Sequence, residues 1–470
     1  MAEQLLSADE LERRMECIAS TYHLVDVRHD RLSYYALTQE ELNKSEYWLC
    51  ISGKFLNLVM DGELDKAMEL INSLPSDGQM GFLKLGCLLV HPQITWKEFK
   101  GIINSLKSAK CPLVHVILTA GRPSVLNGFN DFTRLGPLLE SRKELFVEDL
   151  SWIYEKSVCP AIYDMCLAEY YYQLDRTFDA EVLVSKTIKE FDRGSERRLL
   201  FAALSLQTKI LIAQGKSVNL QSYIKNIRKY VRQTGEAEFY YNLDAAKVMT
   251  AFYEGDNDLM SHWLKDKAPD EFADFNMLDL FRYMVKMRCY IIEEKYTALV
   301  ALAEKLRPLL EAGKRHMDLC EIDLLLAICF YRAKKKELAF EALGRALKIA
   351  RRRKYYRLVG DEGEAILNLL VDYIKEKGET DFLVKLVEIA RSMAINYPLY
   401  LTKFQKKEAL SQRETEILKL LEQGKSKEEI SAFFFVSENT VKYHMKNIYT
   451  KLDSTSALQA IWKARIMGII

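Results

Sequence analysis

A repeated spacing of small and apolar residues constrains the fold of this 470-residue chain more than any other feature. Helical periodicity runs from the start of the chain to about residue 397 and is interrupted by short turns such as MDGELD, AQGKS and YEGDND. Several of the resulting helical hairpins place such residues at a step of 12 and then 4 positions. These residues are Phe55, Ala67 and Ile71, then Ala168, Ala180 and Val184, then Ala327, Ala339 and Leu343. Small residues at these positions let antiparallel helices pack closely, so the spacing predicts a stack of helical hairpins.

The same spacing resembles the tetratricopeptide pattern, in which larger residues fill the groove between paired helices. The Trp and Pro positions of that consensus are absent here, and a generic helical bundle is the alternative. The chain has only 9 Pro and 20 Gly, a composition typical of helices. We therefore predict an all-α protein, with a tetratricopeptide-like helical-hairpin solenoid over residues 1–397, a linker over 398–408 and a small four-helix domain over 409–470.

Charge and cysteine usage exclude several classes of protein. Lys and Arg total 67 and Asp and Glu total 66, so no overall field favours a nucleic acid or a membrane, and any charge-driven function must be local. The 9 cysteines are scattered, form no C-x-x-C pair and lie mostly in apolar helical runs, which is typical of buried thiols in a reducing compartment. No apolar run approaches about 18 residues and the N-terminus lacks a signal-peptide core, so we expect a soluble cytoplasmic protein with no membrane partner.

The sequence EQGKSKEE, residues 422–429, allows two incompatible interpretations. Its tripeptide GKS matches the end of a phosphate-binding loop, which would indicate a nucleotide-dependent enzyme. That motif also needs an earlier glycine, whereas the required position is Lys419. A second GKS, at residues 215–217, has Ile210 at the corresponding position. Neither tripeptide follows a hydrophobic strand, so we predict no nucleotide cofactor and no ATPase.

The other interpretation of residues 422–429 is the junction between two helices. Ser411 with Glu414 and Ser426 with Glu429 have the spacing of capping boxes, each of which starts a helix. Gly424 supplies the left-handed residue that ends the first helix. The predicted buried faces are Ile417, Leu418 and Leu421 in the first helix and Ile430, Phe433 and Phe434 in the second, with Phe435 in the turn that follows.

A third helix begins after Ser437, which is its predicted N-cap. Val436 and Val441 are spaced to form a hydrophobic staple that fixes the angle at which the helix leaves the turn. At about 100° per residue, one side of this helix carries Val441, Met445, Ile448 and Leu452. The opposite side carries Asn439, Tyr443, Lys446 and Thr450, flanked by Lys442 and Asn447. Such a face suits base edges and phosphates in a major groove, so we predict a helix-turn-helix, and an ordinary amphipathic hairpin is the alternative.

Residues 409–470 closely resemble the LuxR-type DNA-binding domain. The matching residues are Leu410, Ser411, Arg413, Glu414, Glu416, Ile417, Leu418, Gly424, Ser426, Glu429, Ile430, Ser437, Thr440, Val441, Lys442, His444, Ile448, Lys451 and Leu452. In that family the lysine of the T-V-K motif, the next residue and the residue four beyond the lysine enter the groove. The resemblance assigns these roles to Lys442, Tyr443 and Lys446; Tyr443 is larger than the usual small apolar residue, a departure that bears on base preference.

The sequence departs from the LuxR pattern after this helix, where residues 453–457 lack the family's turn glycine and the later arginine is also missing. A fourth helix, from about Ala457 to Met467, occupies the place that mediates dimerisation in the family. For His444 we expect a partly buried, hydrogen-bonded side chain rather than a metal ligand, because no second ligand lies at a suitable spacing.

The preceding array is similar to the sensor region of MalT-like, large ATP-binding LuxR regulators. The similarity rests on AEYYYQLDRTFDAE (168–181), FYEGDNDLMSHWL (252–264) and YYRLVGDEGEAILNLL (355–370). Those regulators carry a nucleotide-binding domain before the array, and this sequence does not contain one. The resemblance therefore implies the sensor and output halves of such a regulator, either naturally short or trimmed, and the ATP-driven oligomerisation of the family is not carried over to this chain.

These features together predict a sequence-specific transcription regulator that is not an enzyme and has no catalytic residue, cofactor or metal. Its partners would be double-stranded promoter or operator DNA, bound as a homodimer, and a small-molecule or protein effector on an apolar, Tyr-rich array. The candidate DNA-binding residues are Lys442, Tyr443, Lys446, Asn439, Thr440, Asn447, Ser437 and Thr450. A helical adaptor that holds a protein or peptide in its concave face is the alternative from another class.

Overall fold

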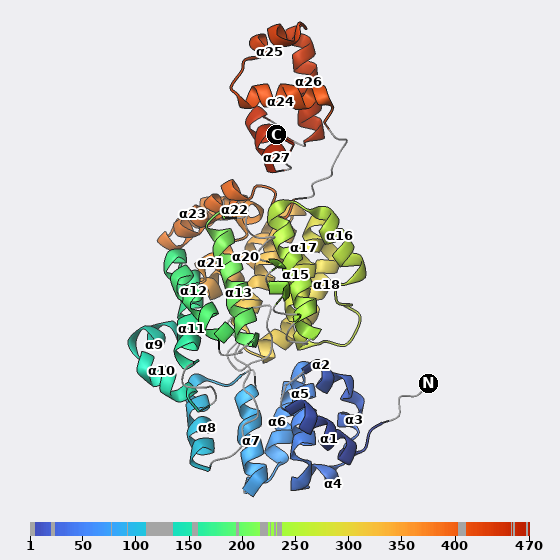
Figure 1. Cartoon of the computed structure of the whole chain (residues 1–470), viewed down its shortest axis with the longest axis vertical. Coiled ribbons are helices and arrows are strands. Elements are labelled where there is room, and N and C mark those ends of the chain that lie inside the picture. The colour runs from blue at the N-terminus through green and yellow to red at the C-terminus, as the bar shows by residue number, and fades with distance from the viewer. Residues whose placement is uncertain are drawn as a thin grey trace.

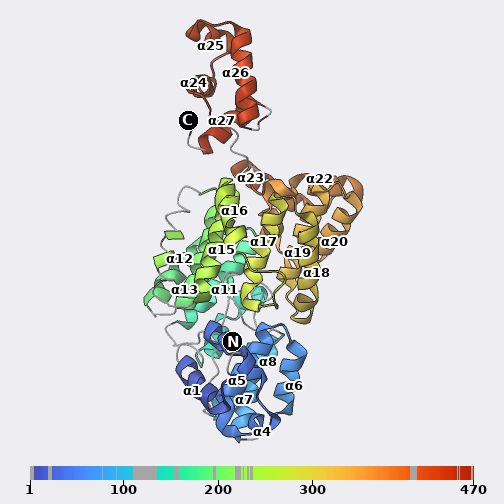
Figure 2. The ribbon, with the colours of Figure 1, turned by 90° about the vertical axis from the view of Figure 1, so that its right-hand side faces the viewer.

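The structure is a computed structural model that describes residues 5–19, 24–76, 78–91, 93–109, 135–152, 158–193, 197–216, 224–225, 227–229, 232, 237–402, 410–452, 454, 456–466 and 469–470. Every regular element in these ranges is helical, which confirms the predicted all-α class. In Figures 1 and 2 the N-terminal helices lie at one end, the main array in the middle and helices α24 to α27 at the other end.

The N-terminal part consists of short helices packed around α5. Its helices are α1 (Ala8–Ala19), α2 (Leu24–His29), α3 (Arg31–Tyr35), α4 (Gln39–Leu42), η1 (Ser45–Tyr47), α5 (Trp48–Met60), α6 (Leu64–Ser73), α7 (Gly78–Val90) and α8 (Trp96–Ala109). Helices α1, α3, α6 and α7 all contact α5. Residues 49–53 and 55–60 of α5 are buried, because apolar residues occur on every side of the helix.

Antiparallel helical hairpins form the middle of the molecule. Their first half comprises α9 (Gly136–Ser141), α10 (Lys143–Leu150), α11 (Cys159–Gln173), α12 (Thr177–Arg193), α13 (Arg197–Ala213), α15 (Ala237–Glu254) and α16 (Asn257–Asp266). The second half comprises η4 (Met277–Asp279), α17 (Leu280–Ile292), α18 (Tyr296–Ala312), α19 (His316–Arg332), α20 (Lys336–Arg353), α21 (Tyr356–Gly360), α22 (Gly363–Lys377) and α23 (Asp381–Asn396). Sequential neighbours pack together, as α11 does with α12 and α19 with α20.

The residues at the repeated spacing are buried where the helices of these hairpins pack together, as predicted. The residues at the predicted 12 and 4 steps are all fully buried: Phe55, Ala67, Ile71, Ala168, Ala180, Val184, Ala327, Ala339 and Leu343. Alanines at these positions leave room for the facing helix, and the larger residues fill the groove beside them. The seven cysteines whose side chains the structure describes are all buried, as expected for structural thiols.

The end of the array is more ordered than its composition indicates. Leu399, Tyr400 and Leu401 lie in the predicted linker, yet each side chain is at most 3% exposed. These residues are apolar although polar residues follow them, so the array buries them. Residues 403–408 of the predicted linker lie outside the described ranges.

The C-terminal domain consists of α24 (Gln412–Glu422), α25 (Lys427–Phe434), α26 (Glu438–Lys451) and α27 (Ala457–Ile466), as the four-helix prediction requires. It has a hydrophobic core of its own, formed by Ile417, Leu418, Ile430, Val441, Met445, Ile448, Leu452, Ala460 and Ala464. Helix α24 contacts both α26 and α27, and α25 contacts α26. The domain therefore has the packing needed to present one helix, α26, on its surface. Within the described part of the chain, no helix is both long and apolar enough to cross a membrane.

Candidate nucleic-acid interface

Reciprocal caps fix the starts of the helices in this domain. The Ser411 hydroxyl accepts a hydrogen bond from the Glu414 amide at 3.2 Å, and the Glu414 carboxylate accepts one from the Ser411 amide at 2.7 Å. Ser426 and Glu429 form the same box, with distances of 3.2 and 2.8 Å. Both predicted capping boxes are confirmed. Each satisfies amides that the first helical turn leaves unpaired.

The turns between the helices use left-handed backbone conformations. Gly424 ends α24 with φ of 79°, as predicted. Phe435 ends α25 with φ of 55° and is 96% exposed, which confirms that it lies in the turn. A non-glycine residue at such a φ carries backbone strain, so this turn is held by the packing of the helices on either side.

The predicted buried face of α25 is only partly correct. Ile430 is fully buried and Phe434 packs at the edge of the core, where the Arg413 guanidinium lies 3.6 Å from its ring centroid. Phe433 is 64% exposed, so its predicted burial is wrong. Helix α25 is only 8 residues long and its core contact is narrow, so the three-residue spacing from Ile430 places Phe433 outside it.

Helix α26 buries the predicted side. Val441, Met445, Ile448 and Leu452 are each at most 6% exposed and belong to the core of the domain. The Ser437 hydroxyl accepts a hydrogen bond from the Thr440 amide at 3.2 Å, which confirms the predicted N-cap. The buried side and the cap together set which residues of α26 point outward.

The outward face of α26 carries the candidate DNA-binding residues. Those in an exposed position are Ser437, Asn439, Lys442, Tyr443, Lys446 and Thr450, and those half-buried are Thr440 and Asn447. Some of their hydroxyls also bond locally: Thr450 Oγ1 donates to the Lys446 carbonyl at 3.0 Å, and Ser437 Oγ lies 2.9 Å from Thr440 Oγ1. Lys442, Tyr443 and Lys446 are all exposed on this face, and Tyr443 is 63% exposed.

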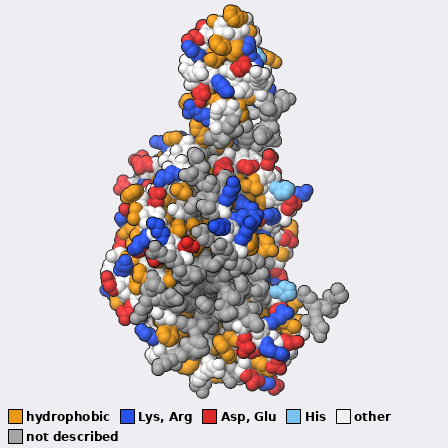
Figure 3. Space-filling model, viewed as in Figure 1, with side chains coloured by type: hydrophobic (Ala, Val, Ile, Leu, Met, Phe, Trp, Pro, Cys, Tyr) orange, Lys and Arg blue, Asp and Glu red, His pale blue; other side chains and the backbone are white. Residues whose placement is uncertain are grey.

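Charge on this face comes from the lysines. The pKa of Glu428 in α25 is lowered, mainly by hydrogen bonds from the Ser426 side chain and from its own backbone. The positive charges of Lys427 and Lys442 lower this pKa further. Figure 3 shows basic, acidic and hydrophobic side chains interspersed on the visible face of the domain. Together with the amide of Asn447 and the phenol of Tyr443, these ammonium groups provide donors for phosphates and base edges.

An ion pair with a buried carboxylate ties α26 to α24. The Lys451 ammonium lies 2.8 Å from the Glu414 carboxylate, which is also the carboxylate of the first capping box. Burial alone would raise the pKa of Glu414, but the bonds from Lys451 and Ser411 outweigh it, and the pKa is lowered. Glu414 therefore fixes both the start of α24 and the end of α26.

His444 differs in part from its prediction. Its side chain is half-buried, as expected, but Nδ1 is buried without a hydrogen-bond partner. Its ring lies edge-on to Tyr443, with centroids 5.8 Å apart. The described residues contain no group of three or more His, Cys, Asp or Glu side chains that could hold a metal ion.

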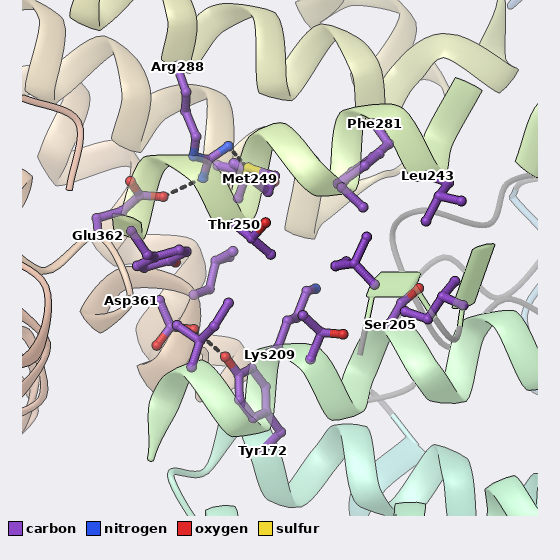
Figure 4. Close-up of a pocket in the computed structure, with 18 of the residues that line it drawn as sticks. Tyr172, Ser205, Lys209, Leu243, Met249, Thr250, Phe281, Arg288, Asp361 and Glu362 are labelled. Carbon is purple, nitrogen blue, oxygen red and sulfur yellow. Dashed lines mark hydrogen bonds and ion pairs between the residues drawn. The ribbon is translucent and has the colours of Figure 1, made fainter. Parts of the chain in front are cut away.

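The sequence interpretation missed a second candidate site, a cavity in the array drawn in Figure 4. Its walls include residues of α11, α13, α15, α17, α19 and α21 and of the loop between α21 and α22, so no short motif contains it. Two tyrosines next to its wall, Tyr397 and Tyr400, are separated only by Pro398 and Leu399. This aromatic pair after a helix was the available signal that the segment is buried.

Comparisons with known proteins agree with this architecture. Residues 159–376 match the family described as the MalT-like TPR region, and residues 408–464 match the family described as bacterial regulatory proteins, luxR family. A Rap protein complexed with Competence and Sporulation Factor is a similar solved structure, with a TM-score of 0.41 and 14% identity over 75% of this chain and 100% of that one.

Two curated relatives are named HTH-type transcriptional regulator MalT. They come from Klebsiella pneumoniae strain 342 and from Klebsiella pneumoniae subsp. pneumoniae strain ATCC 700721 / MGH 78578, and each is 23% identical to this chain over 282 residues. The match covers 56% of this chain and 31% of each relative, so it spans about a third of their length. The chain therefore joins a region similar to the MalT-like TPR region to a C-terminal domain similar to the helix-turn-helix domain of the luxR family of bacterial regulatory proteins.

Proposed function

We propose that the chain is a sequence-specific DNA-binding transcription regulator in which α26 lies in the major groove. Lys442, Tyr443 and Lys446 contact base edges, while Thr440, Asn447 and the N-terminus of α26 contact phosphates. Asn439, Ser437 and Thr450 border this contact surface. A homodimer would place two such helices on successive half-sites of an operator.

One observation carries this proposal: α26 is an amphipathic helix with one side fully buried and a basic, amide-rich side exposed. A helix fixed along its whole buried side can hold side chains in register with base pairs, which a mobile basic tail cannot do. The exposed side has the size and chemistry to enter a major groove. The luxR-family match over residues 408–464 supports the same role.

The helical array is the proposed sensor. Its stacked hairpins give a large internal surface for an effector, and the MalT-like match over residues 159–376 supports that assignment. In this proposal the effector changes how the C-terminal domains are presented to DNA, by acting on the segment around residues 398–408.

The test is selection from a pool of random double-stranded DNA by the full chain at fixed salt, followed by sequencing of the retained fraction. We expect a two-fold motif, which the Lys442→Ala, Lys446→Ala double variant fails to enrich. A matched control is the double variant Lys375→Ala, Lys419→Ala, because it removes the same charge from exposed sites on α22 and α24. This control should enrich the same motif as the unmodified chain.

Equal enrichment by the α26 variant and the control would contradict recognition by α26. If the full chain enriches nothing, the same selection with residues 405–470 distinguishes two cases, since these residues contain the domain's own core. Enrichment by this fragment would show that the array holds the domain away from DNA. No enrichment by either form would favour the adaptor, whose partner is a protein or peptide.

A further inference from the structure

The cavity in the array lies where several hairpins meet. Its volume is about 110 Å³, and the space measures about 980 Å³ when the open solvent at its mouth is included, so a small organic molecule would occupy the cavity and part of its mouth. Tyr172 comes from α11, Ser205 and Lys209 from α13, Met249 and Thr250 from α15, and Phe281 and Arg288 from α17. Figure 4 shows these side chains directed toward a common space.

The two ends of this cavity differ in chemistry. In Figure 4, Arg288, Glu362, Asp361 and Tyr172 gather on one side, and Phe281 and Leu243 lie on the other. The apolar end is extended by Phe201, Ile212, Ala246 and Leu358, which also line the space. The hydroxyl-bearing residues Ser205, Thr208 and Thr250 also line the space. A molecule that matches this wall has an apolar body and a polar, hydrogen-bonding end.

The charged groups at the polar end are already paired with one another. Arg288 lies between two carboxylates: its guanidinium donates to Glu321 at 2.6 Å and also pairs with Glu362. Asp361 accepts a hydrogen bond from the Tyr172 hydroxyl and pairs with Arg357. A charged ligand would have to break one of these buried pairs and lose its own hydration, at a cost that an uncharged ligand avoids.

The same wall residues hold the segment that leads to the DNA-binding domain. Arg288 Nε donates to the Tyr400 hydroxyl at 3.1 Å, and that hydroxyl donates to Glu362 Oε2 at 2.9 Å. The ring of Tyr253, which lines the cavity, stacks on Tyr400 with centroids 4.6 Å apart. The Tyr397 hydroxyl donates to the carbonyl of Ile212, a further wall residue, at 2.9 Å.

Neighbouring contacts fix the backbone of this segment. Arg332 donates to the Leu401 carbonyl at 2.7 Å, and Leu401 has φ of 54°. At Gly255, a Cβ atom would approach Leu399 to 2.8 Å, so the glycine lets the segment pack directly against the end of α15. Residues 397–401 thus pack against residues of the cavity wall, and α24 begins at Gln412.

We propose that this cavity is the effector site, that its ligand is an uncharged amphipathic small molecule, and that the ligand acts on the DNA-binding domain through Tyr400. The polar end of the ligand lies beside Arg288 and Glu362, and its apolar body lies against Phe281 and Leu243. The ligand adds contacts to Tyr253 and Arg288, and both of these residues contact Tyr400. Ligand binding therefore makes the backbone that enters the linker more ordered. The effect of the linker on DNA binding rests on the proposed function. Ligand binding to the cavity and the ordering of residues 397–401 do not depend on it.

Binding is tested on the full chain with a pair of fluorescent probes that differ by one charged group. N-phenyl-1-naphthylamine is uncharged, and 1-anilinonaphthalene-8-sulfonate adds a sulfonate to the same rings. We expect saturable binding of the uncharged probe with one site per chain. The sulfonate should bind at least about tenfold more weakly, a difference of about 1.4 kcal/mol. Equal affinity for the two probes would overturn the assignment to an uncharged ligand.

Two substitutions that narrow the cavity test whether the probe binds in it. Ala246→Phe and Met249→Phe each add bulk to the wall formed by α15, and either should weaken the uncharged probe at least about tenfold. Ala301→Phe, at an exposed position of α18, is the matched control and should leave the affinity unchanged. Circular dichroism identifies a variant that fails to fold. The probe affinity of the other variant then tests whether the probe binds in the cavity. Undiminished binding to the folded variants would overturn the site.

The link to the linker is tested by amide hydrogen exchange of residues 396–402 with and without saturating uncharged probe. We expect exchange in this segment to slow about tenfold, and Tyr400→Phe, which removes the hydroxyl that joins Arg288 to Glu362, to abolish the slowing while leaving probe affinity within about twofold. Unchanged exchange in the unmodified chain would overturn the coupling. None of these readouts needs DNA, so failure of the proposed function and failure of this inference are distinguishable.

Discussion

The two candidate sites of this molecule are built in opposite ways. The candidate DNA-binding surface comes from one helix, α26, which packs against the helices next to it in the sequence. The cavity in the array brings together residues from Tyr172 to Glu362 and is closed beside Tyr400. The first site depends on local caps and helical periodicity, and the second on contacts between distant parts of the chain. The stability of the first site should therefore depend on local contacts and that of the second on long-range contacts. Single substitutions can distinguish these two dependences.

The largest effect is expected at the buried cation of the array. Arg288→Ala removes the cation that pairs with both Glu321 and Glu362 and leaves the two carboxylates buried, so the free energy of unfolding of the array should fall by about 3–5 kcal/mol. Amide hydrogen exchange in α17, α19 and α22 measures this change. Arg345→Ala is the control, because Arg345 is 41% exposed and its partner Asp323 keeps Arg307, and it should cost at most about 1 kcal/mol. Equal costs for the two variants would contradict the long-range network.

Glu414 should give the next largest effect, in the C-terminal domain. Glu414→Gln weakens both the capping box and the ion pair with Lys451, so we expect a loss of about 1–3 kcal/mol, seen as faster exchange in α24 and α26. Glu416→Gln, at a half-exposed site one turn away from the cap, should have almost no effect. A similar loss from both substitutions would show that overall charge, and not the buried pair, stabilises the domain.

The same residue predicts a pH dependence. The pKa of Glu414 is lowered in the folded domain, so its contribution is fully present above the ordinary glutamate pKa of about 4.3. It is lost as the pH falls through the lower, folded-state value. The stability difference between the unmodified domain and Glu414→Gln should therefore shrink below about pH 4. A constant difference across this range would rule out the ionised carboxylate as its source.

A smaller, local effect is expected from the N-cap of α26. Ser437→Ala removes the acceptor for the Thr440 amide and should destabilise the helix by about 1 kcal/mol, with faster exchange confined to its first turn. Ser431→Ala is the control, because the Ser431 hydroxyl only bonds the Glu428 carbonyl within α25. Faster amide exchange throughout the domain would show that this cap stabilises more than the first turn of α26. The difference between the local contacts of this domain and the long-range contacts of the array would then be smaller.

The smallest effect is predicted where helical spacing was misleading. Phe433→Ser replaces a side chain that is 64% exposed, so it should change the free energy of unfolding by no more than about 0.5 kcal/mol. Phe434→Ser removes a ring that packs on the core and under Arg413, and should cost more. The comparison is made by thermal unfolding of the two variants. Equal costs would place Phe433 in the core after all.

The sequence was most informative where the determining contacts are close in the chain. Capping boxes, the glycine at 424 and the buried side of α26 follow from spacings of three to four residues, and the structure has each of them. The burial of Phe433 could not be judged this way, because periodicity gives direction but not the width of the core contact. Tyr400 and the cavity could not be found either, because Arg288 and Glu362 meet only after the hairpins stack.

The most direct test of the account compares the affinity of the full chain for its selected operator with that for a scrambled duplex of the same length, at one salt concentration. We predict that Lys446→Ala loses about 1–3 kcal/mol on the operator and much less on the scrambled duplex, so that the preference between them collapses. An equal loss on both duplexes would make Lys446 a phosphate contact. An unchanged preference in the Lys442→Ala, Lys446→Ala double variant would contradict sequence recognition by α26.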